Sequence, residues 1–166
     1  RIAAGILSWG QDLDHETSPF QVNLSYQVPR NKKSDYIGKA ELERQRGVID
    51  NGDAPFKMKM VGITLGVKEI TDYAPDFWLV ADTDGNDMGY VTSPWWSPEL
   101  ETNIALAWVP WSSSEVGTKL LVKLPDEYSV TPGEPVEGEV VDVPFRESVN
   151  PNKREVEAAK GKDFAE

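Results

Sequence analysis

Between residues 56 and 143 the sequence repeats one arrangement, in which short apolar or alternating runs are separated by turns rich in glycine, proline or aspartate. The runs that we interpret as strands are residues 57–65, 77–81, 88–92, 103–109, 119–124 and 136–143. Short strands at this spacing are typical of antiparallel barrels and sandwiches. The Asp84-Gly85 pair favours a tight hairpin turn between the second and third strands. We therefore predict a mainly β fold that ends in an antiparallel β-barrel.

The stretch from residue 89 to residue 110 is the least ordinary part of this region. Pro94 and Pro98 bracket two adjacent tryptophans, Trp95 and Trp96. Because proline donates no hydrogen bond to a strand ladder, we expect all four residues to lie in a loop between two strands. Large aromatic side chains need a surface to cover. The expected loop is therefore a lid, a clamp or a plug between domains.

The N-terminal third differs from the rest of the chain. Residues 20–28 alternate apolar and polar side chains and predict the clearest strand of the sequence. Residues 36–46 predict a short helix, capped by Ser34 or Asp35 and ended by Gly47. We interpret the loop at residues 48–55 as a domain boundary. The chain is thus predicted to contain an α+β fragment at 1–55, the barrel at 56–145 and a charged tail at 146–166.

Composition excludes several classes of function. The net charge of −11 disfavours nucleic-acid binding, because an acidic surface repels phosphate groups. No apolar run reaches the roughly 20 residues of a membrane-spanning helix, so we expect no membrane partner. The chain contains no cysteine, which is compatible with a cytoplasmic location. It opens at Arg1 without methionine, and we expect it to be a fragment whose N-terminal part is missing.

Residues that could carry catalysis or bind a metal ion have simpler explanations. The aspartates at positions 82, 84 and 87 lack the EF-hand spacing and fit a solvated turn. His15 is the sole histidine and has no nucleophile motif nearby, so we interpret it as a surface residue. One histidine without cysteine also argues against zinc. We therefore assign no catalytic residue and no metal ligand.

Three charged residues near the N-terminus, Arg1, Asp12 and Asp14, are candidates for a site. Asp12 and Asp14 are weak candidates for acid–base chemistry, because exposed loop carboxylates are common and ionised. Arg1 begins an apolar segment and would need a carboxylate or a planar ligand to offset its desolvation. An internal salt bridge and a ligand clamp are equally plausible for it.

Five segments of the chain resemble motifs that occur together in one enzyme family. Residues 1–19 resemble R-x-E-A-G-x-x-x-Y-G-x-D-[IL]-D-E-x-[TS]-[TS]-P, and residues 35–42 resemble D-F-I-G-[KR]-E-A-L. Residues 88–110 are similar to G-x-V-T-S-G-x-x-S-P-x-L-x-x-N-I-A-L-A-x-V. Residues 117–122 and 143–145 match G-T-x-L-x-V and P-F. The matches are collinear over residues 1–145, and the family that they resemble is the tetrahydrofolate-dependent aminomethyltransferases, or T proteins, of the glycine cleavage system.

The resemblance implies a three-domain enzyme wrapped around tetrahydrofolate, of which this chain holds the end of the folate-binding second domain and the C-terminal barrel. It implies that Arg1 contacts the folate. The family's catalytic aspartate and its pterin-binding glutamate would lie upstream, so this chain alone is expected to be inactive. The implied partners are a small one-carbon donor, the missing domains and a lipoyl carrier protein.

The sequence departs from the family pattern at three places. Ala3 replaces the usual glutamate, Trp9 replaces a tyrosine, and residues 94–96 replace a glycine and small residues. We expect Trp9, Trp95 and Trp96 to shape a substrate pocket or a domain seam. The family also includes folate-dependent demethylases, and the altered stretch suggests such a side branch.

A second class of function is open. In that alternative the barrel is a non-catalytic module that packs on a partner through Trp95, Trp96, Trp108 and Trp111. This alternative predicts a start codon near Arg1 and a fragment that is stable and soluble without partners, whereas the enzyme reading predicts an upstream coding region that supplies an acidic catalytic residue.

Overall fold

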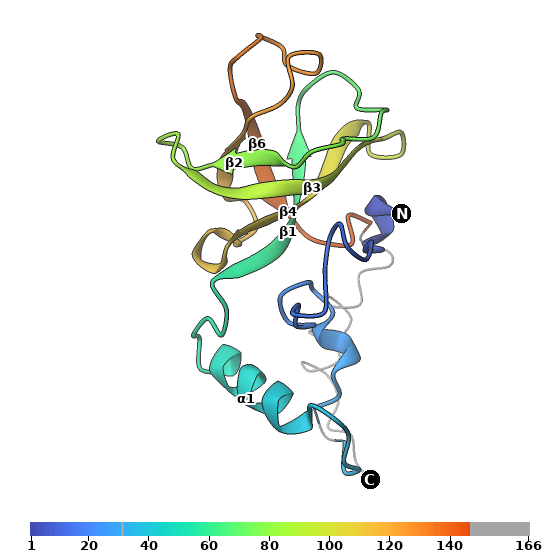
Figure 1. Ribbon diagram of the computed structural model, residues 1–166, viewed down its shortest axis with the longest axis vertical. Coiled ribbons are helices and arrows are strands. Elements are labelled where there is room, and N and C mark those ends of the chain that lie inside the picture. Colours follow the sequence, from blue (N-terminus) through green and yellow to red (C-terminus); the bar gives the residue numbers. More distant parts are fainter. Residues whose placement is uncertain (31, 147–166) are drawn as a thin grey trace.

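The computed structural model describes residues 1–30 and 32–146. Within that part of the chain, strands β1 to β6 close into an antiparallel barrel in the order β1–β4–β3–β2–β5–β6 (Figure 1). The strands are β1 Met58–Leu65, β2 Trp78–Ala81, β3 Asp87–Ser97, β4 Thr102–Pro110, β5 Lys119–Val122 and β6 Val136–Val141. The helices are α1 Lys39–Asp50 and the 3₁₀ turns η1 Ile2–Ala4, η2 Ser25–Gln27 and η3 Trp111–Ser113. The predicted C-terminal barrel is confirmed.

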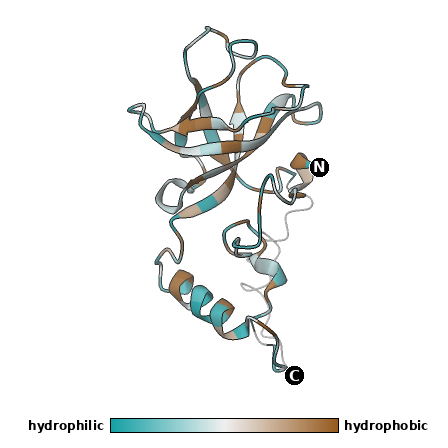
Figure 2. Ribbon diagram, viewed as in Figure 1, coloured by the Kyte–Doolittle hydropathy of each residue, from teal (hydrophilic) through white to brown (hydrophobic). Residues whose placement is uncertain are grey.

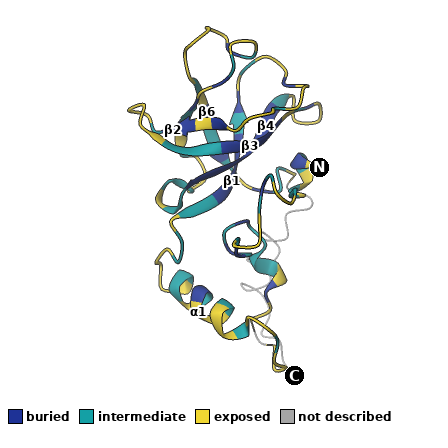
Figure 3. Ribbon diagram, viewed as in Figure 1, coloured by how far each residue is buried: buried dark blue, intermediate teal, exposed yellow. Residues whose placement is uncertain are grey.

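Strand β4 is buried on both of its faces. Ala105, Ala107 and Val109 point into the barrel, whereas Ile104 and Leu106 join an outer cluster. That outer cluster also contains Ile2, Val22, Met60, Trp108 and Val143. Strands buried on both faces carry nearly continuous apolar runs, which explains the sequence of residues 104–109. Figure 3 shows β4 as one of the most buried strands, with the N-terminal segment beside it.

The predicted strand at residues 20–28 is wrong. Asn23 adopts a left-handed φ of 61°, and the chain then turns into η2. This segment contacts β1 through side chains and one backbone bond: Met60 N donates to Gln21 O at 2.8 Å, Asn23 Nδ2 donates to Met60 O at 2.9 Å, and Gln21 Nε2 donates to Met58 O at 3.2 Å. The alternation arises because Phe20 and Val22 are buried without a ladder.

The predicted loop at residues 94–98 is also wrong for all but its last residue, since β3 continues to Ser97. Pro94 is tolerated because β2 pairs with β3 only as far as Val91, so this side of β3 is a free edge. Two residues later, Trp96 N points away from β4 and donates to Ile70 O at 2.7 Å. Proline at position 94 therefore removes no ladder bond.

Helix α1 begins and ends later than predicted. Its N-cap is Gly38 with φ 86°, no side chain caps it, and it runs through Gly47 to Asp50. A glycine inside a helix costs about 1 kcal/mol and does not by itself end it. The helix is mostly hydrophilic (Figure 2) and lies away from the barrel. It is held to residues 18–28 by a hydrogen bond from Ser18 Oγ to Gln45 Oε1 at 2.7 Å.

The remaining sequence-based predictions concern the turn after β2, the charged tail, membrane-spanning helices and the domain division. The turn after β2 forms as predicted, with Asp82 N bonded to Asn86 O at 2.9 Å and Gly85 at φ 89°. The tail from residue 147 onward lies outside the described residues. Among the described residues, no helix combines the length and apolar character needed to cross a membrane. The division of the chain at residue 55 stays a prediction.

Candidate functional site

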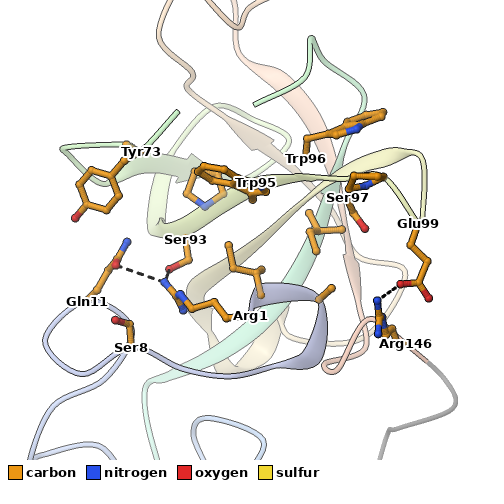
Figure 4. A pocket seen from close by; sticks show the side chains of 16 residues that line it. Arg1, Ser8, Gln11, Tyr73, Ser93, Trp95, Trp96, Ser97, Glu99 and Arg146 are labelled. Carbon is orange, nitrogen blue, oxygen red and sulfur yellow. Dashed lines mark hydrogen bonds and ion pairs between the residues drawn. The ribbon is translucent and has the colours of Figure 1, made fainter. Parts of the chain in front are cut away.

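A pocket of roughly 480 Å³ lies between the N-terminal segment and the far end of β3. Its lining includes Arg1, Gln11, Tyr73, Trp95, Trp96 and Arg146. Figure 4 shows Arg1 next to Gln11 and Ser93 on one side of the pocket, and the ion pair of Glu99 with Arg146 on the other. The pocket combines aromatic surfaces with two guanidinium groups. It therefore suits a planar ligand that carries negative charge.

Asp12 is the centre of the polar network behind this pocket. Its side chain is 0% exposed. Oδ2 accepts hydrogen bonds from Arg1 Nη1 and from Ser8 N, both at 2.7 Å. Oδ1 accepts hydrogen bonds from Thr92 Oγ1 and Ser93 Oγ, both at 2.6 Å. A buried carboxylate is stable only when paired and hydrogen-bonded, and Asp12 meets both conditions.

A β-bulge in β3 makes this network possible. The pairing of β3 with β4 shifts register between Val91 and Ser93, which leaves Thr92 as the extra residue. Successive side chains normally point to opposite faces of a strand, and a bulge breaks that alternation. Both hydroxyls can therefore reach the same oxygen of Asp12.

The pKa of Asp12 reflects two opposing causes. Burial raises the pKa of the carboxyl group, but hydrogen bonds from Ser93, Thr92, Ser8 N–H and Arg1 together lower it below its usual 3.8. The carboxylate is therefore ionised at neutral pH. Its charge holds the guanidinium in place.

Arg1 is fixed by this network and still reaches the pocket. Nη1 also donates to Ile6 O at 3.0 Å, and Nη2 donates to Ser93 Oγ at 2.7 Å. The side chain nevertheless remains 35% exposed. The internal salt bridge is thus observed, and Nη2 also donates to Gln11 Oε1 at 3.4 Å, while part of the side-chain surface stays open to the pocket. The two explanations of Arg1 are compatible.

The tryptophans separate into different environments. Trp95 and Trp96 line the pocket, and Trp95 is 42% exposed. Trp9 is 69% exposed and is not part of this lining. Trp108 is buried, and its indole N–H donates to Asp12 O at 2.9 Å. Trp111 lies elsewhere, beside Phe56 at 6.4 Å between ring centroids. The structure therefore does not gather the four tryptophans on one surface.

Sequence reasoning missed the main residues of the network. It treated Asp12 as an exposed loop carboxylate and said nothing of Thr92 and Ser93, which lie 80 and 81 positions away. Local patterns carry no signal for such distant contacts. The one available signal was that residues 1–19 and 88–110 both match motifs of the same family. Among the described residues, no group of three or more His, Cys, Asp or Glu side chains could hold a metal ion.

Fold and site together define a small antiparallel barrel that carries a ligand-sized pocket where a preceding segment packs on its outer face. Comparison with known proteins identifies the class. The family model described as "Glycine cleavage T-protein C-terminal barrel domain" matches residues 59–146. The chain belongs to the glycine cleavage T-protein family.

Individual relatives agree with this assignment. An aminomethyltransferase of Synechocystis is 35% identical over 75% of this chain and 31% of its own length. An aminomethyltransferase of Rubrobacter xylanophilus is 31% identical over 87% of this chain and 34% of its own length. The crystal structure of glycine cleavage system aminomethyltransferase T from Bartonella henselae superposes with a TM-score of 0.66 and 25% identity, over 89% of this chain and 37% of that one. The chain thus spans about a third of these relatives.

Proposed function

We propose that this chain is the C-terminal part of a tetrahydrofolate-dependent one-carbon transferase, and that its pocket forms part of the folate site. The observation that carries the proposal is the partly exposed side chain of Arg1, which lines the pocket and is held there by the buried carboxylate of Asp12. The relatives named above support an aminomethyl or methyl transfer reaction, since they are aminomethyltransferases.

The residues of the pocket fit a folate. Folates combine a planar ring system with carboxylates. Trp95 and Tyr73 offer aromatic faces and Arg1 offers a guanidinium group, while Arg146 is paired with Glu99 at the same pocket. When bound, tetrahydrofolate supplies the nitrogen that receives the one-carbon unit. The contribution of this chain is to orient the ligand: Arg1 donates hydrogen bonds, and the aromatic side chains exclude water.

The remaining parts of the proposal concern the whole enzyme. Its other domains would supply the catalytic carboxylate, and the chain alone would be inactive. The one-carbon donor would be a small molecule or an aminomethyl group on a lipoyl carrier protein. Trp95 and Trp96 occupy part of the pocket, which favours a small methylated donor and a place among the demethylases. A cytoplasmic location stays a prediction.

The test is to identify the folate product. Full-length protein containing this chain is incubated with tetrahydrofolate and candidate donors, and the product is analysed by mass spectrometry. Methyl-tetrahydrofolate from a free methylated donor is the expected result. Methylene-tetrahydrofolate formed from a lipoyl-bound aminomethyl group would overturn the demethylase placement while retaining the folate site. No folate product and no folate binding would overturn the proposal as a whole.

The second candidate, a non-catalytic module that binds a partner, retains one supporting observation. Trp95 and Tyr73 are both exposed and line the same pocket. The burial of Trp108 removes it from any such surface. Association with a partner protein that needs Trp95 but not Arg1 would favour this candidate.

A further inference from the structure

A second pocket of roughly 370 Å³ is lined in part by Asp12 and shares Gln11 with the first pocket. Its floor includes Met58 and Trp108, and one wall is the loop at residues 10–17. The other wall is an aromatic pair, in which Phe77 stacks on Tyr90 with ring centroids 5.3 Å apart and an interplanar angle of 16°. Phe77 is 51% exposed. This aromatic wall has no role in the folate proposal.

The charged side chains that line this pocket are all acidic: Asp12, Asp14 and Glu16. Asp12 is already paired with Arg1. Asp14 Oδ1 accepts hydrogen bonds from Glu16 N at 2.9 Å and Thr17 Oγ1 at 3.0 Å. Asp14 is exposed, so its carboxylate stays accessible to a ligand. His15 is adjacent in the loop but does not line the pocket.

The electrostatic field of the pocket has a definite sign. Burial, and then the negative charge of Asp14, raise the pKa of the Tyr90 phenol above its usual value. Burial disfavours an ion of either sign, whereas the negative charge of Asp14 disfavours the phenolate and favours a cation at the same place. Aromatic faces add to this preference through cation–π attraction, which strengthens as the cation loses water.

We propose that this pocket binds an organic cation, with the ammonium group seated between Asp14 and the Phe77–Tyr90 pair. The size of the pocket suits a small alkylammonium ion or the end of a lysine side chain. Carboxylates supply the charge and the aromatic rings supply the desolvated surface, as in sites that recognise methylated ammonium groups. The proposal does not depend on folate binding, because the side chains that would hold the cation, Asp14, Phe77 and Tyr90, do not line the first pocket.

The experiment follows the indole N–H of Trp108 and the neighbouring amides of this chain by NMR during titration with choline chloride. The matched ligand is 3,3-dimethylbutan-1-ol, which has the same shape without the charge, and ionic strength is held constant with sodium chloride. A second titration with Nα-acetyl-lysine methylamide distinguishes a protein side chain from a free cation. We expect saturable shifts with one or both cations and none with the alcohol.

Substitutions in the pocket test the same proposal through cation affinity. Asp14→Asn keeps the acceptor for Glu16 N and Thr17 but removes the charge, and it is expected to weaken binding about tenfold. Phe77→Ala is expected to weaken it about threefold to tenfold. The control Glu115→Gln makes the same change of charge outside the pocket lining and is expected to change nothing. Binding of the alcohol as tight as that of choline, unchanged binding in Asp14→Asn, or no saturation with either cation would each overturn the proposal.

Discussion

At the scale of single residues, one buried carboxylate joins two parts of the chain that are distant in sequence. Asp12 binds the guanidinium of Arg1 on one side and the hydroxyls of Thr92 and Ser93 on the other. Arg1 is thereby held in one orientation before any ligand arrives. Such preorganisation lowers the entropy cost of binding.

Asp12→Asn tests this role through stability. Removing one partner of a buried ion pair leaves the other unpaired, and we expect a loss of about 3 kcal/mol in the free energy of unfolding at pH 7. The folded-state pKa of Asp12 is lowered, so its stabilising contribution is present above the unfolded value of 3.8 and is lost as the pH falls through the folded-state pKa. The difference between wild type and variant, measured by urea unfolding, should therefore shrink below about pH 4. A difference that does not change with pH would contradict the assignment.

Ser129 gives a prediction of the opposite sign. Among the described residues, its Oγ is a buried side-chain oxygen without a hydrogen-bond partner. Leaving such a group unsatisfied costs about 1–3 kcal/mol, so Ser129→Ala should stabilise the protein by about 1 kcal/mol. The control is Ser93→Ala, in which the lost hydroxyl bridges Arg1 and Asp12, and which should destabilise it by about 2 kcal/mol. If Ser129→Ala and Ser93→Ala changed the thermal unfolding temperature equally, the two hydroxyls would not differ in hydrogen bonding as the structure shows.

At the scale of elements, the strands of the barrel were predictable, whereas the extension of β3 and the conformation of residues 20–28 were not. The strands follow from alternating or buried apolar runs between turns, and these signals are local. The extension of β3 through Pro94 depends on the edge left free by the short β2, which no local pattern reveals. The misassigned strand at residues 20–28 has the correct buried residues, but Asn23 turns the chain away from the sheet.

The pairing of β3 with β4 requires glycine at position 89. A Cβ atom there would lie 2.1 Å from Trp108 O, which is backbone and cannot move aside. We expect Gly89→Ala to destabilise the barrel by about 3 kcal/mol or more. The matched control is Gly47→Ala in α1, where nothing lies within 4 Å of the added atom. That change should stabilise the protein by about 0.5–1 kcal/mol through helix propensity. Circular dichroism during thermal unfolding measures both, and a tolerated Gly89→Ala would disprove the close approach.

At the scale of the whole molecule, the barrel and the N-terminal segment form one site between them. The segment contributes Arg1 and Asp12, and the barrel contributes the hydroxyls of β3 and the aromatic residues of the pocket. Residues 1–19 and 88–110 resemble motifs of the same family, and the family resemblance implied that Arg1 contacts the folate. The contact between them became visible only in the structure, because it joins residues about 80 positions apart.

The most direct test of the account is the affinity of the full-length protein for tetrahydrofolate, measured by calorimetry for wild type and Arg1→Lys. Lysine keeps the charge opposite Asp12 but lacks the planar fork of donors. Loss of one charge-assisted hydrogen bond corresponds to about tenfold weaker binding or more. The control Arg30→Lys alters an exposed ion pair with Asp50 outside the pocket lining and should bind as wild type does. A tenfold or greater loss in Arg1→Lys alone is the result we predict, and wild-type affinity in that variant would contradict the role of Arg1 in the folate site.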